Sequence, residues 1–326
     1  MSLLIYSIVM CHQKKINERM IKIFAAPLQG YTDAAWRHFH AEIYDGIDSY
    51  FTPFLRVEKG AMRSQDIKAI NSSLNVNQNL IPQIIFRDIN EFEILTDTLV
   101  QKGYKYVDLN LGCPFPPQVK HGRGAAVICN ETLLRELSER IKKHKEIEFS
   151  IKMRLGVDSP DTWRGAIEIL NETPLTHITI HPRIAQQQYS GDLYIEQFAE
   201  LLKISSHYVI FNGDLTSNSE ITKRLSQFPS LAGIMIGRGL LKRPSLALEF
   251  RNGEEWDENR RIQLLVKFHN KLFEHYKNNL CGDTQILSKI KPFWEYLEDE
   301  IGRKTAKAIR KATSLNKYLS AVSMVD

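Results

Sequence analysis

A thiol lies where an apolar run of the sequence stops abruptly. In Val107-Asp108-Leu109-Asn110-Leu111-Gly112-Cys113-Pro114, a pattern typical of a buried strand contains two polar residues and ends at a glycine. The polar pair indicates side chains aimed into a site. Gly112 permits a sharp turn or a close approach to a ligand, and Pro114 makes the exit rigid. We therefore expect Cys113 to be placed for reaction. The structural alternative is a small buried cysteine at a loop.

Six other apolar runs end in groups that could bind a ligand: Pro27-Leu28-Gln29-Gly30, Gln83, Lys152 with Arg154, His181 with Arg183, Asn212-Gly213-Asp214 and Gly237-Arg238-Gly239. The glycine-containing turns of the last two groups expose backbone N–H groups, and Arg238 adds forked donors, which predicts a phosphate clamp. Gln83, Lys152 and His181 would then face a flat ring, and a lysine there can stabilise negative charge on a reduced flavin. The residues predict a phosphorylated planar cofactor beside a thiol.

Eight short apolar runs must position these groups. The expected strands are Lys22–Pro27, Asp48–Pro53, Ile81–Phe86, Lys105–Leu111, Ile147–Arg154, Thr176–His181, Tyr208–Asn212 and Gly233–Gly237. Amphipathic helices are expected between them, among them Glu91–Lys102, Glu131–Lys143, Thr162–Asn171 and Ser219–Gln227. This alternation predicts an α/β fold, a closed (β/α)8 or TIM barrel, with its site at the carboxyl ends of the strands. An open doubly wound sheet is the alternative, but the sequence lacks its G-x-G-x-x-G fingerprint and a Walker A loop.

A helical region follows the last strand. Segments Glu254–Lys277, Gln285–Glu300 and Arg303–Leu319 predict three helices, a small all-α domain. The third would gather six basic residues within an arc of roughly 140°: Arg303, Lys304, Lys307, Arg310, Lys311 and Lys317. A stripe of one sign is typical of a surface that follows nucleic-acid phosphates. A solvated basic face is the alternative.

Composition limits the class of protein. The chain has 326 residues, of which 43% are hydrophobic and 25% charged, and a formal net charge of +5 that permits a polyanionic partner. Its four cysteines, Cys11, Cys113, Cys129 and Cys281, are too scattered for a disulfide framework or a zinc site. No apolar run approaches the ~20 residues that span a bilayer. We expect a cytoplasmic monomer that binds neither metal nor membrane.

The sequence divides into three parts. Residues 1–19 contain a short apolar stretch without a basic flank before it, so we expect an extension outside the fold rather than a signal peptide. Residues 20–248 form the predicted barrel, which binds the cofactor and carries the catalytic residue. Residues 249–326 form the predicted helical domain, whose basic stripe we expect to bind nucleic acid.

Several motifs resemble those of the tRNA-dihydrouridine synthases. Ala26-Pro27-Leu28-Gln29-Gly30-Tyr31-Thr32-Asp33 is similar to their APMxGxTD segment, and Asn110-Leu111-Gly112-Cys113-Pro114 matches NxGCP. Lys152-Met153-Arg154-Leu155-Gly156 resembles KxRxG, His181-Pro182-Arg183 resembles HxR, and Asn212-Gly213-Asp214 and Ile236-Gly237-Arg238-Gly239 match NGD and IGRG. Gln187, Gln188 and Tyr189, with the helical tail, lean toward the bacterial C-type subgroup.

The resemblance implies NADPH-dependent reduction of the C5–C6 double bond of a uridine in tRNA. FMN would give hydride to C6 and Cys113 a proton to C5, as a thiol with a pKa near 8.5 is protonated at neutral pH. FMN would be bound by Pro27, Leu28, Gln29, Gln83, Lys152, His181, Asn212, Gly213, Asp214, Gly237 and Arg238. The tRNA substrate would be bound by Asn110, Arg183, Tyr189, Arg303, Lys307 and Arg310, with further phosphate contacts from Lys120, His121 and Arg123.

Two other functions stay open from the sequence. A different FMN barrel, such as a dihydroorotate or dihydropyrimidine dehydrogenase, would share the clamp and the lysine and act on a free base, but would not need the basic helical region. A tRNA-binding protein without catalysis would need neither Cys113, Lys152 nor His181, and the presence of all three argues against it.

Overall fold

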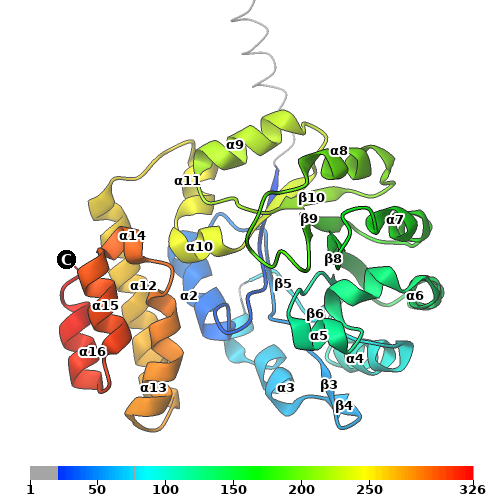
Figure 1. Ribbon diagram of the computed structural model, residues 1–326. Coiled ribbons are helices and arrows are strands. Elements are labelled where there is room, and N and C mark those ends of the chain that lie inside the picture. Colours follow the sequence, from blue (N-terminus) through cyan, green and yellow to red (C-terminus); the bar gives the residue numbers. More distant parts are fainter. Residues whose placement is uncertain (1–20, 77, 326) are drawn as a thin grey trace, which may run out of the picture.

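A computed structural model describes residues 21–76 and 78–325 of the chain, so the extension predicted for residues 1–19, including Cys11, lies outside the described residues. A ring of strands stands at the centre, surrounded by helices, and a further group of helices packs on one side (Figure 1). None of the helices in the described ranges has both the length and the apolar character needed to cross a membrane.

The barrel strands form one parallel sheet. In chain order they are β1 (Lys22–Ala25), β2 (Ser49–Phe51), β5 (Leu80–Ile81), β6 (Gln83–Ile84), β7 (Tyr106–Leu111), β8 (Glu148–Gly156), β9 (Ile178–Ile184), β10 (Val209–Asn212) and β11 (Gly233–Ile236). The order in the sheet is β5-β2-β1-β11-β10-β9-β8-β7-β6, and β1 pairs with β11 through four residues in register.

Pro82 explains why the third predicted strand appears as two short ones. It lies between β5, which pairs with β2, and β6, which pairs with β7, so residues 80–84 join both edges of the sheet. Proline has no N–H for the ladder, but its carbonyl still accepts the N–H of Asp108 at 2.9 Å. The eight predicted strands are all present, and the predicted (β/α)8 barrel is confirmed.

Helices cover the outside of the barrel. They include α2 (Ala34–Tyr44), α3 (Ser64–Ile70), α4 (Ile89–Gln101), α6 (Glu131–Lys143), α7 (Trp163–Asn171), α8 (Ile195–Ile204), α9 (Asn218–Gln227) and α11 (Leu246–Asn252). Side-chain caps explain where several begin, since Asn130 accepts the N–H of Leu133 at 3.0 Å and Ser217 that of Glu220 at 3.3 Å. The sequence did not predict a small hairpin of β3 (Val57–Glu58) and β4 (Ala61–Met62), or the short helices α5 (Pro116–Lys120) and η2 (Gly124–Cys129).

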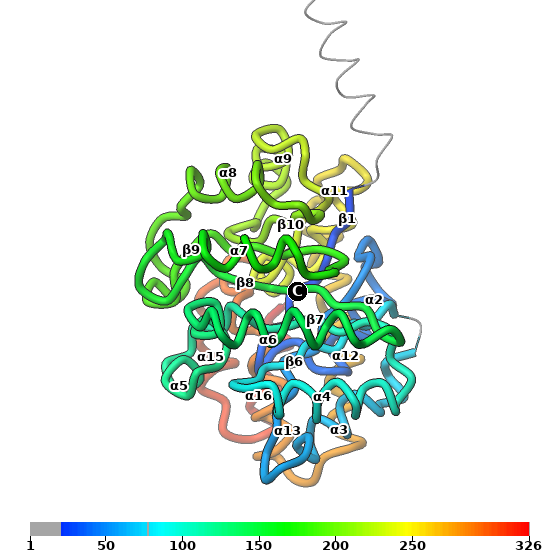
Figure 2. Tube along the Cα trace, turned by 90° about the vertical axis from the view of Figure 1, so that its right-hand side faces the viewer, coloured from blue at the N-terminus to red at the C-terminus, as the bar shows by residue number. Residues whose placement is uncertain are grey.

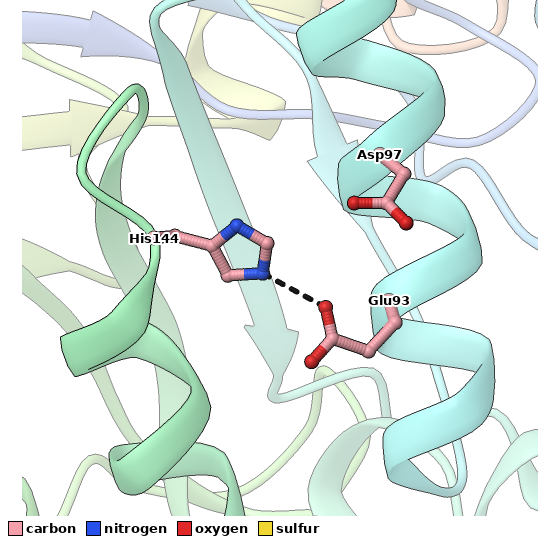
Figure 3. A group of neighbouring side chains, drawn as sticks. All are labelled: Glu93, Asp97 and His144. Atoms are coloured by element: carbon pink, nitrogen blue, oxygen red, sulfur yellow. Dashed lines mark hydrogen bonds and ion pairs between the residues drawn. The ribbon is translucent and has the colours of Figure 1, made fainter.

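An ion-pair group ties α4 to the end of α6. The ring of His144 is directed at Glu93 (Figure 3), with 2.8 Å between Nε2 and a carboxylate oxygen, and Arg140 lies 3.6 Å from the same carboxylate. Glu93, Asp97 and His144 offer atoms within 4.8 Å of one another, which is close enough for a metal ion. Ion pairing with His144 and Arg140 accounts for the position of Glu93 in this group.

The barrel interior has an apolar side and a polar side. Phe24, Phe51, Ile210 and Met235, from β1, β2, β10 and β11, belong to a small cluster separate from the main core. On the other side, Gln83 of β6, Asp108 of β7 and Ser150 of β8 are cross-strand neighbours. Buried polar groups need hydrogen-bond partners, so the side chains on this polar side must bond to one another or to a ligand.

The helical tail has more breaks than the sequence predicted. It consists of α12 (Glu258–Asn279), α13 (Gly282–Ile290), η3 (Lys291–Trp294), α14 (Glu298–Ile301), α15 (Arg303–Lys311) and α16 (Leu315–Val322). The predicted second helix is interrupted around Pro292, and the third ends at Lys311 before Ser314 caps a new helix. The prediction of three helices was therefore wrong, and Lys317 lies on α16 rather than in a stripe with the basic residues of α15.

The tail packs on α2 rather than standing apart. The ring of Phe268 on α12 lies 5.7 Å from Trp36 and 5.8 Å from Tyr44, and the main hydrophobic core is continuous across this contact. Figure 2, viewed from the side of α6 and α7, shows the orange and red tail on the far side of the barrel. The division of the chain at residue 248 stays a prediction.

Candidate active site

A cavity opens at the carboxyl ends of the strands. It encloses about 950 Å³ between atoms, part of it open solvent, and Cys113, Asn110 and Tyr189 line it. Every residue predicted to bind the cofactor lines the same cavity: Pro27, Leu28, Gln29, Gln83, Lys152, His181, Asn212, Gly213, Asp214, Gly237 and Arg238. The barrel therefore brings together groups as distant in the sequence as Pro27 and Arg238.

Cys113 is held by its backbone at the rim of β7. Its N–H donates to Oδ1 of Asn110 at 2.8 Å, and its carbonyl accepts the N–H of Ala125 at 3.1 Å. Gly124 makes this contact possible, because a Cβ there would lie 2.7 Å from the Cys113 carbonyl oxygen. Burial raises the pKa of the Cys113 thiol above its ordinary value. The thiol is therefore protonated at neutral pH and can donate a proton.

Lys152 and His181 carry different charges in the same cavity. Burial and the neighbouring Arg154 lower the pKa of Lys152 to about 8, so its ammonium is still mostly charged at pH 7. Burial, with Arg154 and Lys152 close by, holds the pKa of His181 well below its ordinary value, so its imidazole is neutral. The cavity thus combines a cationic donor with a neutral ring that can donate or accept.

Arg183 does not line the cavity, and its role in substrate binding stays a prediction. Its side chain is buried, and its guanidinium donates to the two carboxylate oxygens of Asp214 at 2.9 and 2.5 Å and to the carbonyl of Gly191 at 3.1 and 2.7 Å. These bonds occupy the side chain, which ties the loop after β9 to the loop after β10. In the structure Arg183 positions neighbouring loops.

Tyr189 lies at the mouth of the cavity between two arginines. The guanidinium of Arg238 lies 4.8 Å from its ring centroid and that of Arg154 lies 5.4 Å away. Arg238 also pairs with Asp214 at 3.1 Å. The sequence analysis placed Arg154 at a strand end but predicted no role for it. In the structure Arg154 lines the cavity, as do Phe54, Leu215, Thr216 and Met235.

Two glycine turns shape the end of the cavity beneath Arg238. Gly213 has φ of +140°, which side chains rarely adopt. A Cβ on Gly239 would lie 2.0 Å from the Leu215 carbonyl oxygen, so the two turns can pack only with glycine there. Helix α10 (Arg238–Lys242) starts at this point, and its first internal bond runs from the N–H of Leu240 to the Gly237 carbonyl at 3.0 Å. The N–H groups of residues 237–239 precede that bond and can serve a ligand.

The remaining predicted substrate residues lie outside this cavity. Arg303, Lys307 and Arg310 are exposed on α15, whose opposite face buries Thr305, Ala306 and Ile309. A groove between α13, α14 and α15 is lined in part by Arg310, Lys291 and Glu295. Glu295 accepts a hydrogen bond from Tyr31 at 2.8 Å, which connects this groove to the loop after β1 at the cavity.

Further phosphate contacts were predicted for three residues near the cavity. Arg123 instead pairs with buried Glu91 at 2.5 Å, and a ring nitrogen of His121 lies 2.6 Å from the Pro117 carbonyl oxygen. Lys120 is exposed at the end of α5. Among the described residues, Lys120 is the one member of this group of three without a contact that would compete with a phosphate.

A comparison with protein families decides between the barrels that could carry such a site. The model of the family described as "Dihydrouridine synthase (Dus)" matches residues 24–319, which covers barrel and tail together. The chain belongs to the dihydrouridine synthase family. The resemblance seen in the sequence motifs is thereby confirmed, while the C-type subgroup stays a prediction.

Individual relatives agree with this family. The chain is 28% identical over 259 residues to a "Probable tRNA-dihydrouridine synthase" of Staphylococcus epidermidis, covering 77% of each chain. It is 26% identical to the "Probable tRNA-dihydrouridine synthase 2" of Bacillus subtilis, covering 77% of this chain and 78% of that protein. Among solved structures, histamine dehydrogenase from Rhizobium sp. 4-9 matches 71% of this chain and 46% of its own, with a TM-score of 0.51 and 14% identity, which shows a shared barrel fold.

Proposed function

We propose that this protein is a tRNA-dihydrouridine synthase, which reduces the C5–C6 double bond of a uridine in tRNA with NADPH, a bound FMN and Cys113 as proton donor. Family membership over most of the chain supports the reaction class. The observation that carries the proposal is that Cys113, protonated and held at a strand end, shares one cavity with every residue predicted to bind the flavin.

The lining of the cavity fits FMN in charge and shape. The phosphate would lie at the glycine turns, where residues 237–239 offer N–H groups and Arg238 offers a guanidinium. The flavin ring would lie toward Lys152, His181 and Gln83. Among the described residues the Lys152 ammonium makes no hydrogen bond, although it is partly buried, so a bound acceptor would satisfy it.

The chain's own residues would orient the base and move one proton. When bound and reduced by NADPH, FMN supplies the hydride for C6 of the uracil ring. Cys113 donates the proton to C5 and regains it from solvent, so one NADPH and one proton are consumed for each uridine. Asn110 lies beside Cys113 and would bind the uracil edge. Taking the base out of the tRNA stack costs a few kcal/mol, which phosphate contacts from α15 would offset.

Replacing the proposed acid separates the two halves of the reaction. In Cys113→Ala, flavin reduction by NADPH should proceed within about twofold of the normal rate, because no thiol is needed for it. Dihydrouridine formation should fall by about 10²-fold or more, within the range that a general acid contributes. Stopped-flow flavin absorbance and nucleoside mass spectrometry measure the two steps.

A matched control uses a cysteine outside the cavity. Cys281 is exposed in the helical tail, so Cys281→Ala should leave both steps unchanged. Normal dihydrouridine formation by Cys113→Ala would remove Cys113 as the acid.

A further inference from the structure

A buried carboxylate lies on β7, the strand that leads to Cys113. Asp108 of β7 and Gln83 of β6 are both 0% exposed, inside the barrel. The Ser150 hydroxyl donates to Oδ1 of Asp108 at 2.6 Å, and Nε2 of Gln83 donates to Oδ2 at 2.7 Å. Asp108 is not among the residues that line the cavity. The proposed reaction gives this carboxylate no direct part.

Hydrogen bonds continue from Asp108 to the cysteine without a gap. Oε1 of Gln83 accepts from Nδ2 of Asn110 at 2.7 Å. Oδ1 of Asn110 in turn accepts the N–H groups of Cys113 at 2.8 Å and Gly112 at 3.2 Å. The chain of contacts thus runs from the barrel interior to the backbone of the proposed acid.

The carboxylate requires one direction of this chain of contacts. An amide side chain can present either its NH2 or its carbonyl to a neighbour, whereas an ionised carboxylate only accepts. Facing Asp108, Gln83 must turn its nitrogen inward and its oxygen toward Asn110. Asn110 must then turn its nitrogen toward Gln83 and its oxygen toward the Cys113 loop. At the other end of the chain, the backbone N–H groups of Cys113 and Gly112 only donate, so they require the same orientation of both amides.

We propose that Asp108 is a positioning residue, which anchors the inner end of the chain formed by the Gln83 and Asn110 amides and through them holds the Cys113 loop. A second consequence concerns recognition. The chain uses the oxygen of each amide, and each amide nitrogen keeps one hydrogen that the chain does not use. This wall of the cavity therefore offers donors, which select carbonyl oxygens on a bound ring. Only the benefit to uridine reduction rests on the proposed function.

Alkylation of the Cys113 thiol tests the positioning without tRNA. In Asp108→Asn a neutral amide replaces the charged acceptor and weakens the inner anchor of the loop, so iodoacetamide should modify Cys113 about threefold faster or more, as quantified by peptide mass spectrometry. In an Asn110→Ala background the chain is already cut beside the cysteine. Asp108→Asn should add nothing there, because coupled residues are not additive. An equal increase in both backgrounds would overturn the proposal, since a general loosening of the barrel predicts it.

A second buried aspartate provides the matched control. Asp66 is buried on α3, where it accepts from Arg63 at 2.6 Å and from the N–H of Arg56 at 3.0 Å, away from the cavity. Asp66→Asn removes a buried charge of the same kind and should leave the alkylation of Cys113 unchanged. An unchanged alkylation rate in Asp108→Asn would also overturn the proposal.

Catalysis provides an independent reading. Asp108→Asn should slow dihydrouridine formation by about tenfold, because a displaced acid loses alignment with its carbon, whereas Asp66→Asn should not. A normal rate in Asp108→Asn would contradict the positioning role. If the unaltered protein formed no dihydrouridine at all, the proposed function would fail, and the alkylation measurements would still decide the role of Asp108.

Discussion

At the scale of single residues, the sequence predicted most residues of the cavity. It could not distinguish side chains that line the cavity from side chains that hold neighbouring loops in place. Arg154 and Arg183 both follow polar strand ends and look alike in the sequence. Arg154 lines the cavity, whereas Arg183 is bound by Asp214, which lies 31 residues further along the chain. The position of such a partner depends on how β9 and β10 are paired. Only the folded barrel supplies that information.

The charge of Lys152 predicts a pH limit for flavin reduction. Because burial and Arg154 lower its pKa to about 8, the ammonium is present below that pH and is lost above it. The negative charge on a reduced flavin would lose its partner, so the rate of flavin reduction by NADPH should fall as pH rises through about 8. Lys152→Met should be slow at every pH and show no such step. Stopped-flow absorbance between pH 6 and 10 measures both, and a step of full size in Lys152→Met would assign it to another group.

At the scale of elements, the sequence predicted the barrel strands well and the tail helices less well. Short apolar runs bounded by polar residues are typical of the buried strands of a parallel barrel, and all eight predicted strands are present. In the tail, a helical period continued through Pro292 and through residues 312–314. The break before α16 is stabilised by Ser314 and by Lys291, whose ammonium donates to the Ala312 carbonyl at 2.9 Å. Because Lys291 lies on a neighbouring element, this break depends on a tertiary contact, which helical periodicity in the sequence does not reveal.

The basic face of α15 predicts a measurable salt effect. Replacing Arg303, Lys307 and Arg310 with alanine should weaken tRNA binding and reduce the slope of log affinity against log salt by about 2, if each residue contacts a phosphate. Fluorescence anisotropy at several salt concentrations measures the slope. The groove beside α15 and the cavity are connected through Tyr31 and Glu295, so a tRNA on this face could reach both.

A charge-matched variant controls for the lower net charge. Lys102, Lys143 and Lys203 are exposed at the ends of α4, α6 and α8, where the barrel faces away from the cavity. Replacing them with alanine should leave the slope close to that of the unaltered protein. Equal slopes for both triple variants would show that the basic face of α15 is solvated and does not contact tRNA phosphates.

At the scale of the whole molecule, barrel and tail share one hydrophobic core at the contact of α12 with α2. Phe268 is fully buried there, between Trp36 and Tyr44. Sequence periodicity predicted that α12 is a helix but could not show which barrel helix receives it, since that depends on three-dimensional packing. The shared core fixes the position of the tail relative to the cavity. A surface that presents a tRNA base to the cavity would need such a fixed position.

Truncating Phe268 should loosen both parts together. Phe268→Ala should lower the free energy of unfolding by about 3–5 kcal/mol, as is typical of a buried phenylalanine. Urea unfolding should show one transition shifted as a whole, because the lost contact belongs to a common core. Leu319→Ala, at an exposed position of α16, should change stability by about 0.5 kcal/mol or less. A tail that unfolds separately in the unaltered protein would contradict the common core.

Uridine within tRNA is the proposed substrate of the cavity. The most direct measurement is nucleoside mass spectrometry of an unmodified tRNA transcript after incubation with the purified protein, FMN and NADPH, with free uracil and uridine as parallel substrates. We predict dihydrouridine in the tRNA, none from the free base or nucleoside, and none in tRNA without NADPH. Reduction of free uracil with the tRNA left unchanged would contradict the account and make the protein a dehydrogenase of free pyrimidines.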